Sequence, residues 1–270
     1  MLTARTFLVR GLLAGLIAGV VTFGVAYVIG EPSINAAIAI EEAGSAAVED
    51  HTHDATVVGA AAAAEEHSHG GEAEVSRENQ STWGLATATI LIGVALGGIA
   101  GLGAAFACGR FGRLSPRAGT AVVAAIGFVS IYLVPFLKYP PNPPAVGNPD
   151  TIGQRTAWYF AMLAVSVVAA VAAVVVACRL TPRLGSWPAG LAAGAGYLVV
   201  VLVTAGLLPS IDEVPDDFPA DLLWEFRTAS LAVQLTLWLV IGVALATMIG
   251  SAARKSAGSP PAAQLAGTAA

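Results

Sequence analysis

The sequence predicts an all-α integral membrane protein, a polytopic helix bundle that forms one membrane domain over residues 1–270. Hydrophobic residues make up 56% of the chain and charged residues only 11%, whereas a soluble domain carries about a quarter charged residues. The mean hydropathy is +0.74. Six stretches of 20 or more residues contain no Asp, Glu, Lys or Arg, and a helix needs about 20 apolar residues to span a bilayer. An ordinary soluble domain is therefore excluded.

Each uncharged stretch predicts one transmembrane helix, because a backbone in lipid must satisfy its own hydrogen bonds and no stretch alternates like a barrel strand. The six predicted spans cover about residues 9–30, 84–107, 118–137, 157–178, 188–209 and 229–250. Cleavage of the first as a signal peptide would leave five. However, the apolar run from Leu12 to Ile29 is longer than the roughly 7–15 residues usual in such peptides.

Glycines recur at four-residue spacing in the first two predicted spans. Small residues on one stripe of a helix let a second helix approach closely. The spacing therefore predicts helix packing within the bundle; a glycine-lined conduit is the weaker reading. The residues concerned are Gly11, Gly15 and Gly19, and Gly93, Gly97 and Gly101.

The basic residues predict the orientation of the bundle. Nine of them, without a neighbouring acid, are Arg5, Arg10, Arg110, Arg113, Arg117, Arg179, Arg183, Arg254 and Lys255. All 18 carboxylates lie on the opposite side. By the positive-inside rule we expect both termini, including the tail 251–270, to lie in the cytoplasm.

The first external segment, residues 31–82, is rich in Ala, Glu, Gly and Ser, and we expect a largely disordered loop. All four histidines of the chain lie in it as two His-x-His pairs, each preceded by two acidic residues. Imidazole binds Zn, Cu, Ni and Co, and such a pair on a flexible chain can chelate one ion. A solvated polar tract is the alternative. The candidate metal ligands are His51, His53, Asp54, His67 and His69.

Two more external segments carry candidate residues for a cation path. The run from Lys138 to Gly147 contains four prolines, which have no backbone N–H, so its carbonyls and the Asn142 amide are oxygen ligands that can replace a cation's water. A rigid interhelical turn is the alternative. Residues 208–227 gather six carboxylates beside a span and can attract cations. The predicted path is Tyr139, Asn142, Glu225 and Gln234, with Lys138, Arg155 and Arg227 as a structural rim. We expect Lys138 and Arg227 to pair with neighbouring acids, so that neither opposes an entering dication.

Several function classes are disfavoured. No Walker motif, nucleophile elbow or HExxH helix occurs, so we expect no enzyme and no covalently bound cofactor. Thirteen Lys and Arg face 18 Asp and Glu, which argues against a nucleic-acid partner. The predicted spans contain no ionisable Asp, Glu, His, Lys or Arg, and proton-coupled carriers usually place one there.

These residues resemble the CbtA-type predicted cobalt transporter subunits of bacteria, and the resemblance implies a place in the bacterial cytoplasmic (inner) membrane. The likeness covers nearly the whole chain and is most specific in the proline run and in the Phe218-Pro219 to Arg227 segment. It also rests on Arg10-Gly11 with its glycine-spaced span, and on Arg155, Gln234 and Trp238. The resemblance implies cobalt uptake, often linked to cobalamin synthesis, and a small CbtB-type partner subunit with a histidine-rich metal site.

Two features depart from that family. Its members are usually described with five spans rather than six, and the histidine-rich first loop here is unusually long. The leading hypothesis is a transition-metal permease, for cobalt, whose outer loop collects the ion. The alternatives are a non-transporting scaffold or metal-sensing subunit that docks a partner through its polar loop, and a carrier of small organic substrates. Membrane lipid surrounds the bundle in every case, and a homo-oligomer stays open.

Overall fold

The computed structural model describes residues 2–53, 76–110 and 114–258. Every regular element within these residues is helical. Six helical stretches among them are long and apolar enough to cross a membrane: Ala4–Gly44, Arg77–Ala107, Pro116–Lys138, Pro149–Leu184, Ser186–Leu207 and Ala220–Ser256. The prediction of an all-α, polytopic membrane bundle is confirmed.

In chain order the helices are α1 (Ala4–Val25), α2 (Glu31–His53), α3 (Arg77–Asn79), α4 (Leu85–Ala107), α5 (Pro116–Gly127), α6 (Val134–Lys138), α7 (Ile152–Leu184), α8 (Ser186–Leu207) and α9 (Ala220–Gly258). Short π-helical turns, η1 (Ala26–Gly30), η2 (Gln80–Gly84) and η3 (Phe128–Leu133), lie within three of the spans, and a 3₁₀ turn, η4 (Pro149–Thr151), precedes α7. Pro135 lies two positions after the end of η3, and it interrupts the helical hydrogen bonds there because a proline has no backbone N–H.

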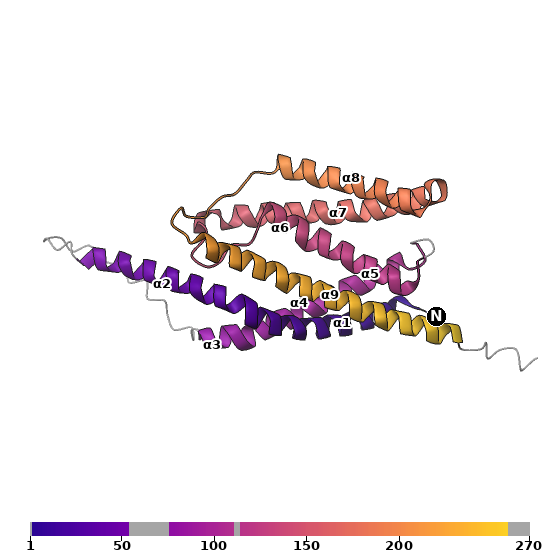
Figure 1. Cartoon of the computed structure of the whole chain (residues 1–270), viewed down its shortest axis with the longest axis horizontal. Helices are drawn as coiled ribbons and strands as arrows, with labels where there is room; N and C mark the ends of the chain where they lie inside the picture. The colour runs from indigo at the N-terminus through magenta and orange to yellow at the C-terminus, as the bar shows by residue number, and fades with distance from the viewer. Residues whose placement is uncertain (1, 54–75, 111–113, 259–270) are drawn as a thin grey trace, which may run out of the picture.

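The segment between the first two spans differs from the disordered loop expected for residues 31–82, because residues 31–53 and 77–84 are helical. Residues 31–53 form α2, which continues α1 past the π turn, and α3 with η2 leads into α4. Ala and Glu are strong helix formers, and that propensity outweighs the low hydrophobicity on which the expectation of disorder rested. Figure 1 shows α2 extending past the ends of the other helices.

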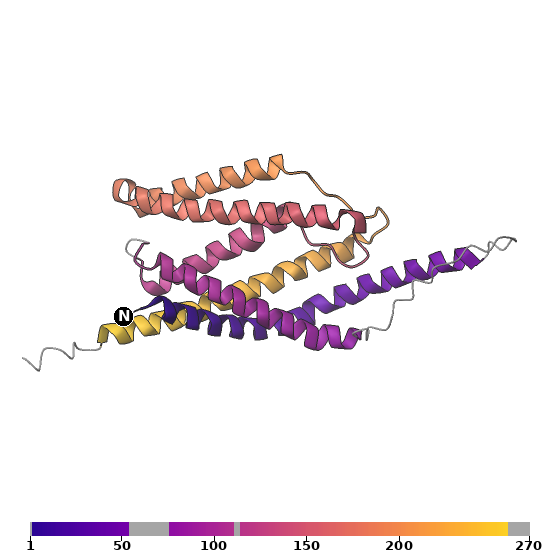
Figure 2. The same ribbon diagram turned by 180° about the vertical axis from the view of Figure 1, so that it is seen from behind.

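The helices form layers along a common long axis. The pair α7–α8 lies on one side and the pair α1–α4 on the other, with α5 and α9 between them (Figures 1 and 2). The start of α1 and the end of α9 lie at the same end of the molecule. We call that end, which carries Arg110, Arg179 and Arg183, the arginine end, and the end that carries the proline run the proline end.

The closest packing in the bundle joins α1 and α4 through their glycines. A Cβ atom built at Gly15 would overlap the carbonyl oxygen of Gly93, and one built at Gly97 would overlap that of Gly11. The two backbones are therefore in direct contact, and the glycine spacing serves packing as predicted.

The third member of this core is α9. Its buried side chains pack against α1 and α4 in a cluster made of Phe7, Ala14, Ala18, Ala100, Ala104, Leu237, Ile241, Leu245 and Ile249. At the arginine end, Arg10 donates a hydrogen bond of 2.8 Å from Nη1 to the Met248 carbonyl oxygen. A second, smaller cluster of Val134, Met162 and Val201 joins α6 to the α7–α8 hairpin.

We expect Gly15→Ala to destabilise the protein by about 1–3 kcal/mol, because its methyl group overlaps backbone that can move only if α1 and α4 separate. Thermal unfolding of purified protein in detergent measures the effect. Gly24→Ala is the matched control, since a Cβ at Gly24 of the same helix meets nothing within 4 Å. Equal melting temperatures for the two variants would contradict the contact.

Candidate functional site

A pocket of about 630 Å³ lies at the proline end of the bundle. Its walls come from the end of the third span, the proline run, the start of α7, residues 211–214 and the second turn of α9. Its polar lining consists of Tyr132, Tyr139, Asn142, Arg155, Thr156, Tyr159, Asp212, Glu213 and Arg227. Residues from the range 132–160 thus meet residues 211–214 and Arg227 in one cavity.

The proline run forms one wall of this pocket because α6 cannot continue through it. The helix ends at Lys138, and the Tyr139 N–H makes the last helical bond, 2.8 Å to the Pro135 carbonyl oxygen. Consecutive prolines then hold the chain extended. The Tyr139 hydroxyl donates a 2.9 Å hydrogen bond to the Pro209 carbonyl oxygen. The run is therefore joined to the segment that follows α8.

Glu213 connects that segment to the start of α7. Its carboxylate accepts hydrogen bonds from the Thr151 hydroxyl and from the Asn148 backbone N–H, the latter at 2.9 Å. The same carboxylate lies 3.3 Å from Nε of Arg155. The side chain of Glu213 is 14% exposed, so these contacts replace most of the water that a free carboxylate would bind.

The contacts of Glu213 lower its pKa below the ordinary value of 4.5. The Thr151 hydroxyl lowers the pKa most and the Asn148 N–H next, because each hydrogen bond favours the charged form. Desolvation acts in the opposite direction, and the charge of Arg155 adds to the lowering. Glu213 is therefore a carboxylate throughout the neutral range.

Arg227 reaches the pocket from α9 and contacts the proline run. Its Nη2 donates 3.0 Å to Oδ1 of Asn142, and its Nε donates 3.4 Å to the carbonyl oxygen of Pro141. No described carboxylate lies within ion-pair distance of Arg227. Lys138 likewise lies over the Tyr139 ring, with Nζ 5.6 Å from the ring centroid, rather than beside an acid. The expectation that Arg227 and Lys138 pair with neighbouring acids is therefore wrong within the described residues.

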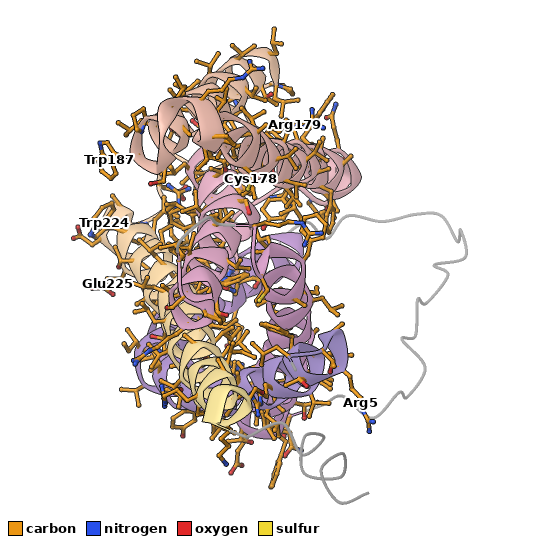
Figure 3. All side chains as sticks on the ribbon, turned by 90° about the vertical axis from the view of Figure 1, so that its right-hand side faces the viewer. Arg5, Cys178, Arg179, Trp187, Trp224 and Glu225 are labelled. Atoms are coloured by element: carbon orange, nitrogen blue, oxygen red, sulfur yellow. The ribbon has the colours of Figure 1, made fainter. Side chains whose placement is uncertain are left out.

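The pocket brings together only part of the predicted path and rim. Tyr139, Asn142, Arg155 and Arg227 share it. Glu225 is exposed and, with Trp224, lies on the outer flank of α9 (Figure 3). Gln234 is half-buried about two turns below Arg227 and does not line the pocket.

Sequence reasoning did not single out Glu213 or Thr151. Glu213 was one of six carboxylates in an acidic segment, and nothing in that segment distinguishes it from its neighbours. Its role comes from a contact with Arg155, which lies 58 positions earlier in the chain. Only the tertiary structure supplies that pairing.

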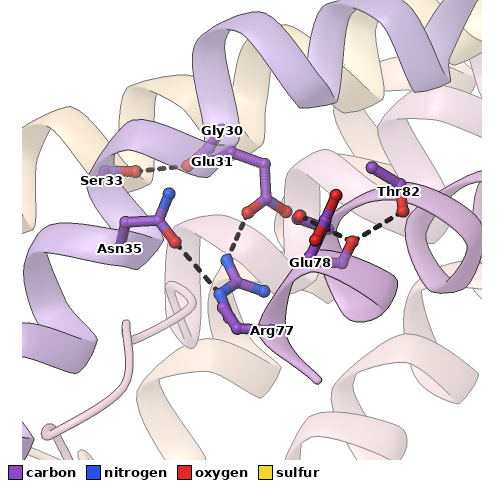
Figure 4. A network of polar contacts seen from close by, with 8 residues as sticks. Gly30, Glu31, Ser33, Asn35, Arg77, Glu78 and Thr82 are labelled. Atoms are coloured by element: carbon purple, nitrogen blue, oxygen red, sulfur yellow. Dashed lines mark hydrogen bonds and ion pairs between the residues drawn. The ribbon is translucent and has the colours of Figure 1, made fainter. Parts of the chain in front are cut away.

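The base of the histidine-bearing segment is fastened to the bundle by a polar network (Figure 4). Arg77, at the start of α3, forms an ion pair with the buried carboxylate of Glu31 and donates 3.0 Å from Nε to Oδ1 of Asn35. The Ser33 hydroxyl donates 2.9 Å to the Gly30 carbonyl oxygen. Both ends of the intervening segment are thus held together at the start of α2.

The predicted histidine ligands lie beyond this network. The backbone of His51 and His53 forms the end of α2, while Asp54, His67 and His69 lie outside the described residues. In the part of the chain that the structure describes, no three or more His, Cys, Asp or Glu residues gather as a metal site. The described pocket therefore offers oxygen atoms and charges rather than a closed metal centre.

A second cavity, of about 800 Å³, lies near the arginine end between α5, α7 and α8. Ala, Val and Gly form most of its wall, and Arg110, Cys178 and Trp187 line it; the last two are labelled in Figure 3. Tyr197 also lines it, and its hydroxyl lies 2.9 Å from the hydroxyl of the fully buried Ser166. The α7–α8 hairpin therefore borders both cavities.

We expect Glu213→Gln to lower the melting temperature at pH 7, because the variant loses the charge that Arg155, Thr151 and Asn148 stabilise. A lowered pKa contributes stability above the unfolded value of about 4.5, and this contribution disappears as pH falls through the folded value. The difference from the unsubstituted protein should therefore shrink below about pH 4.5. Melting curves in detergent between pH 3 and 8 measure it. Asp216→Asn, an exposed change in the same segment, is the control, and a difference independent of pH would contradict this role.

The family model CbtA, described as a probable cobalt transporter subunit, matches residues 4–250 of the 270-residue chain. No curated protein and no solved structure matches the chain. The six apolar helices agree with a multi-pass membrane protein, and the resemblance inferred from the sequence is confirmed. With a match over nearly its whole length, the chain belongs to the CbtA family of probable cobalt transporter subunits.

Proposed function

We propose that this protein carries Co²⁺ into the bacterial cytoplasm and that the ion enters the bundle through the pocket at the proline end. The observation that carries the proposal is the composition of this pocket. The Pro141 carbonyl and Asn142 amide oxygens project to the side chain of Arg227, and Asp212 and Glu213 line the same cavity. Carbonyl, amide and carboxylate oxygens can replace water around a cation.

The distribution of charge supports an external position for the proline end. The arginine end carries basic residues without neighbouring acids. All 18 carboxylates belong to the segments that connect the spans at the opposite end. Under the positive-inside rule the arginine end and both termini are cytoplasmic. A cation would then approach the acidic side first, where negative charge raises its local concentration.

The histidine-bearing segment acts before the pocket in this proposal. His51, His53, Asp54, His67 and His69 collect the ion outside the membrane, and the Arg77–Glu31 pair holds the base of the segment to the bundle. Exposed Glu225 lies outside the pocket at the proline end and attracts cations toward the opening of that pocket, which we call the mouth. Tyr139 and Asn142 form the wall of the pocket, and Lys138, Arg155 and Arg227 shape its rim. Gln234 lies about two turns further along α9 from Arg227.

The driving force is the membrane potential. Moving two positive charges inward is favoured by about 4.6 kcal/mol at 100 mV, which needs no ionisable group inside the membrane. Because the family is that of a transporter subunit, other subunits belong to the system, and we propose a small, histidine-containing CbtB-type subunit among them.

The orientation is checked by cysteine labelling in a background without Cys108 and Cys178. Ala60→Cys should react with a membrane-impermeant maleimide on intact cells, whereas Ser256→Cys should react only after permeabilisation. The reverse pattern would exclude the proposed topology.

Transport is checked by cobalt accumulation in cells that express the chain with and without its partner subunit. Asn142→Ala and Gln234→Ala should each lower the maximal uptake several-fold, because they remove oxygen ligands along the path. Replacing the four histidines by Ala should instead raise the cobalt concentration at half-maximal uptake, since capture precedes the pocket.

The matched control for both amides is Gln154→Ala, which removes an exposed amide near the same end without changing the pocket lining. Uptake is compared at equal amounts of protein in the membrane. Normal transport by the Asn142 and Gln234 variants would show that the pocket is structural.

A further inference from the structure

We infer that Arg227 is a tethered cation that occupies the oxygen site at the mouth, so that an incoming metal ion must displace its guanidinium group. This inference rests on the proposed function and names the residue that sets how firmly a cation must bind to enter. It starts from the two oxygen atoms that Arg227 contacts, Oδ1 of Asn142 at 3.0 Å and the carbonyl oxygen of Pro141 at 3.4 Å.

These oxygens lie where the chain itself provides few donors. Of the five residues from Pro140 to Pro144, only Asn142 has a backbone N–H. The half-buried oxygens therefore need a donor or a cation from elsewhere, because a polar atom removed from water without a partner is costly. Arg227 supplies both, as a charged group with N–H donors.

The charge of Arg227 is not cancelled in the way that the charge of its neighbour is. Arg155 lies 3.3 Å from the Glu213 carboxylate, whereas Arg227 contacts neutral oxygens and no described carboxylate. Glu225 is two positions earlier on α9, and side chains at that spacing on a helix do not face each other. The guanidinium group of Arg227 thus has no described ion-pair partner, and it lies at the oxygens that a cation would use.

A dication bound at the same oxygens would meet a repelling charge within a few ångströms. Metal binding and the Arg227 contact are therefore mutually exclusive. The apparent dissociation constant is the intrinsic one divided by the fraction of molecules in which Arg227 has moved away.

This competition sets a threshold of affinity. Arg227 raises the apparent dissociation constant of every cation by the same factor, so an ion that binds these oxygens firmly still occupies the site at its working concentration, while an ion that binds weakly does not. Mg²⁺ dehydrates reluctantly, and the order of divalent transition metals places Co²⁺ above Mn²⁺ and Fe²⁺. Co²⁺ therefore displaces the guanidinium at lower concentrations than these three ions.

The first test measures Co²⁺ binding by equilibrium dialysis to the purified full-length chain in detergent, with the four histidines replaced by Ala to remove the loop. Arg227→Gln keeps an N–H for Asn142 and removes the charge, so it should bind Co²⁺ about tenfold more tightly and Mg²⁺ more tightly by the same factor. Arg227→Lys, which keeps the charge, should remain within about twofold of the unsubstituted residue. Adding Asn142→Ala to Arg227→Gln should remove the gain.

Arg183→Gln is the matched control, because it removes an exposed arginine at the other end of α7. Unchanged or weaker Co²⁺ binding by a folded Arg227→Gln variant would overturn the inference. Binding is measured without transport, so a chain that binds as expected but accumulates no cobalt would count against the proposed function and not against the role of Arg227.

A second test needs no substitution at Arg227. In the full-length chain, Co²⁺ should accelerate modification of Arg227 by phenylglyoxal, read by mass spectrometry, because the displaced guanidinium becomes free to react. The rate at Arg183 should stay constant. Slower or unchanged modification of Arg227 at saturating Co²⁺ would show that the ion and the guanidinium do not compete.

Discussion

The rest of the structure depends on one constraint, that a peptide backbone in hydrocarbon must find its hydrogen-bond partners within itself. The spans obey it as helices. Short π turns change the hydrogen-bond spacing next to Gly30, Gly84 and Pro135. Nearly all charged side chains are therefore confined to the two ends. Chemistry that needs charged groups, or oxygen atoms not used in helical hydrogen bonds, has room only there. At the proline end one pocket gathers such groups from residues 132–160, from residues 211–214 and from Arg227.

The same constraint explains how the bundle is held together. Lipid supplies no hydrophobic drive between helices, so association relies on close packing. The backbone contact of α1 with α4 achieves this through glycine, and α9 completes the cluster with Leu237, Ile241 and Leu245. The proline end is organised differently, by hydrogen bonds and an ion pair that join the connecting segments to one another and to α7 and α9. Rigid packing thus supports a mouth made of exchangeable polar contacts.

Much of the fold could be predicted from the sequence, because its signals are local. Uncharged runs of at least 20 residues mark the spans, and the glycine spacing marks the α1–α4 contact. The candidate site was predicted only in part. Tyr139, Asn142, Arg155 and Arg227 do share a pocket, but their partners depend on tertiary geometry. Nothing in the order of residues pairs Arg155 with Glu213 or aims Arg227 at an amide.

The helix over residues 31–53 was missed for a different reason. Low hydrophobicity argues that a segment cannot form a core, yet a helix that continues an existing one needs no new nucleus. α1 supplies the nucleated turns, and Ala-rich and Glu-rich sequence then extends them. The composition of residues 31–53 favours disorder only when the preceding helix α1 is left out of account.

The α7–α8 hairpin has the geometry of a lever. Gly185, at φ +83°, is the only residue between the two helices, so they form one body. At the proline end α7 packs on α6 and η3, whereas near the arginine end a cavity of about 800 Å³ lies between the hairpin and α5. A helix of 33 residues is about 50 Å long, so a rotation of about 5° at the attached end displaces the other by about 4 Å. Small rearrangements of the polar contacts at the mouth can therefore change the width of the distant cavity mechanically, without any charged relay through the membrane.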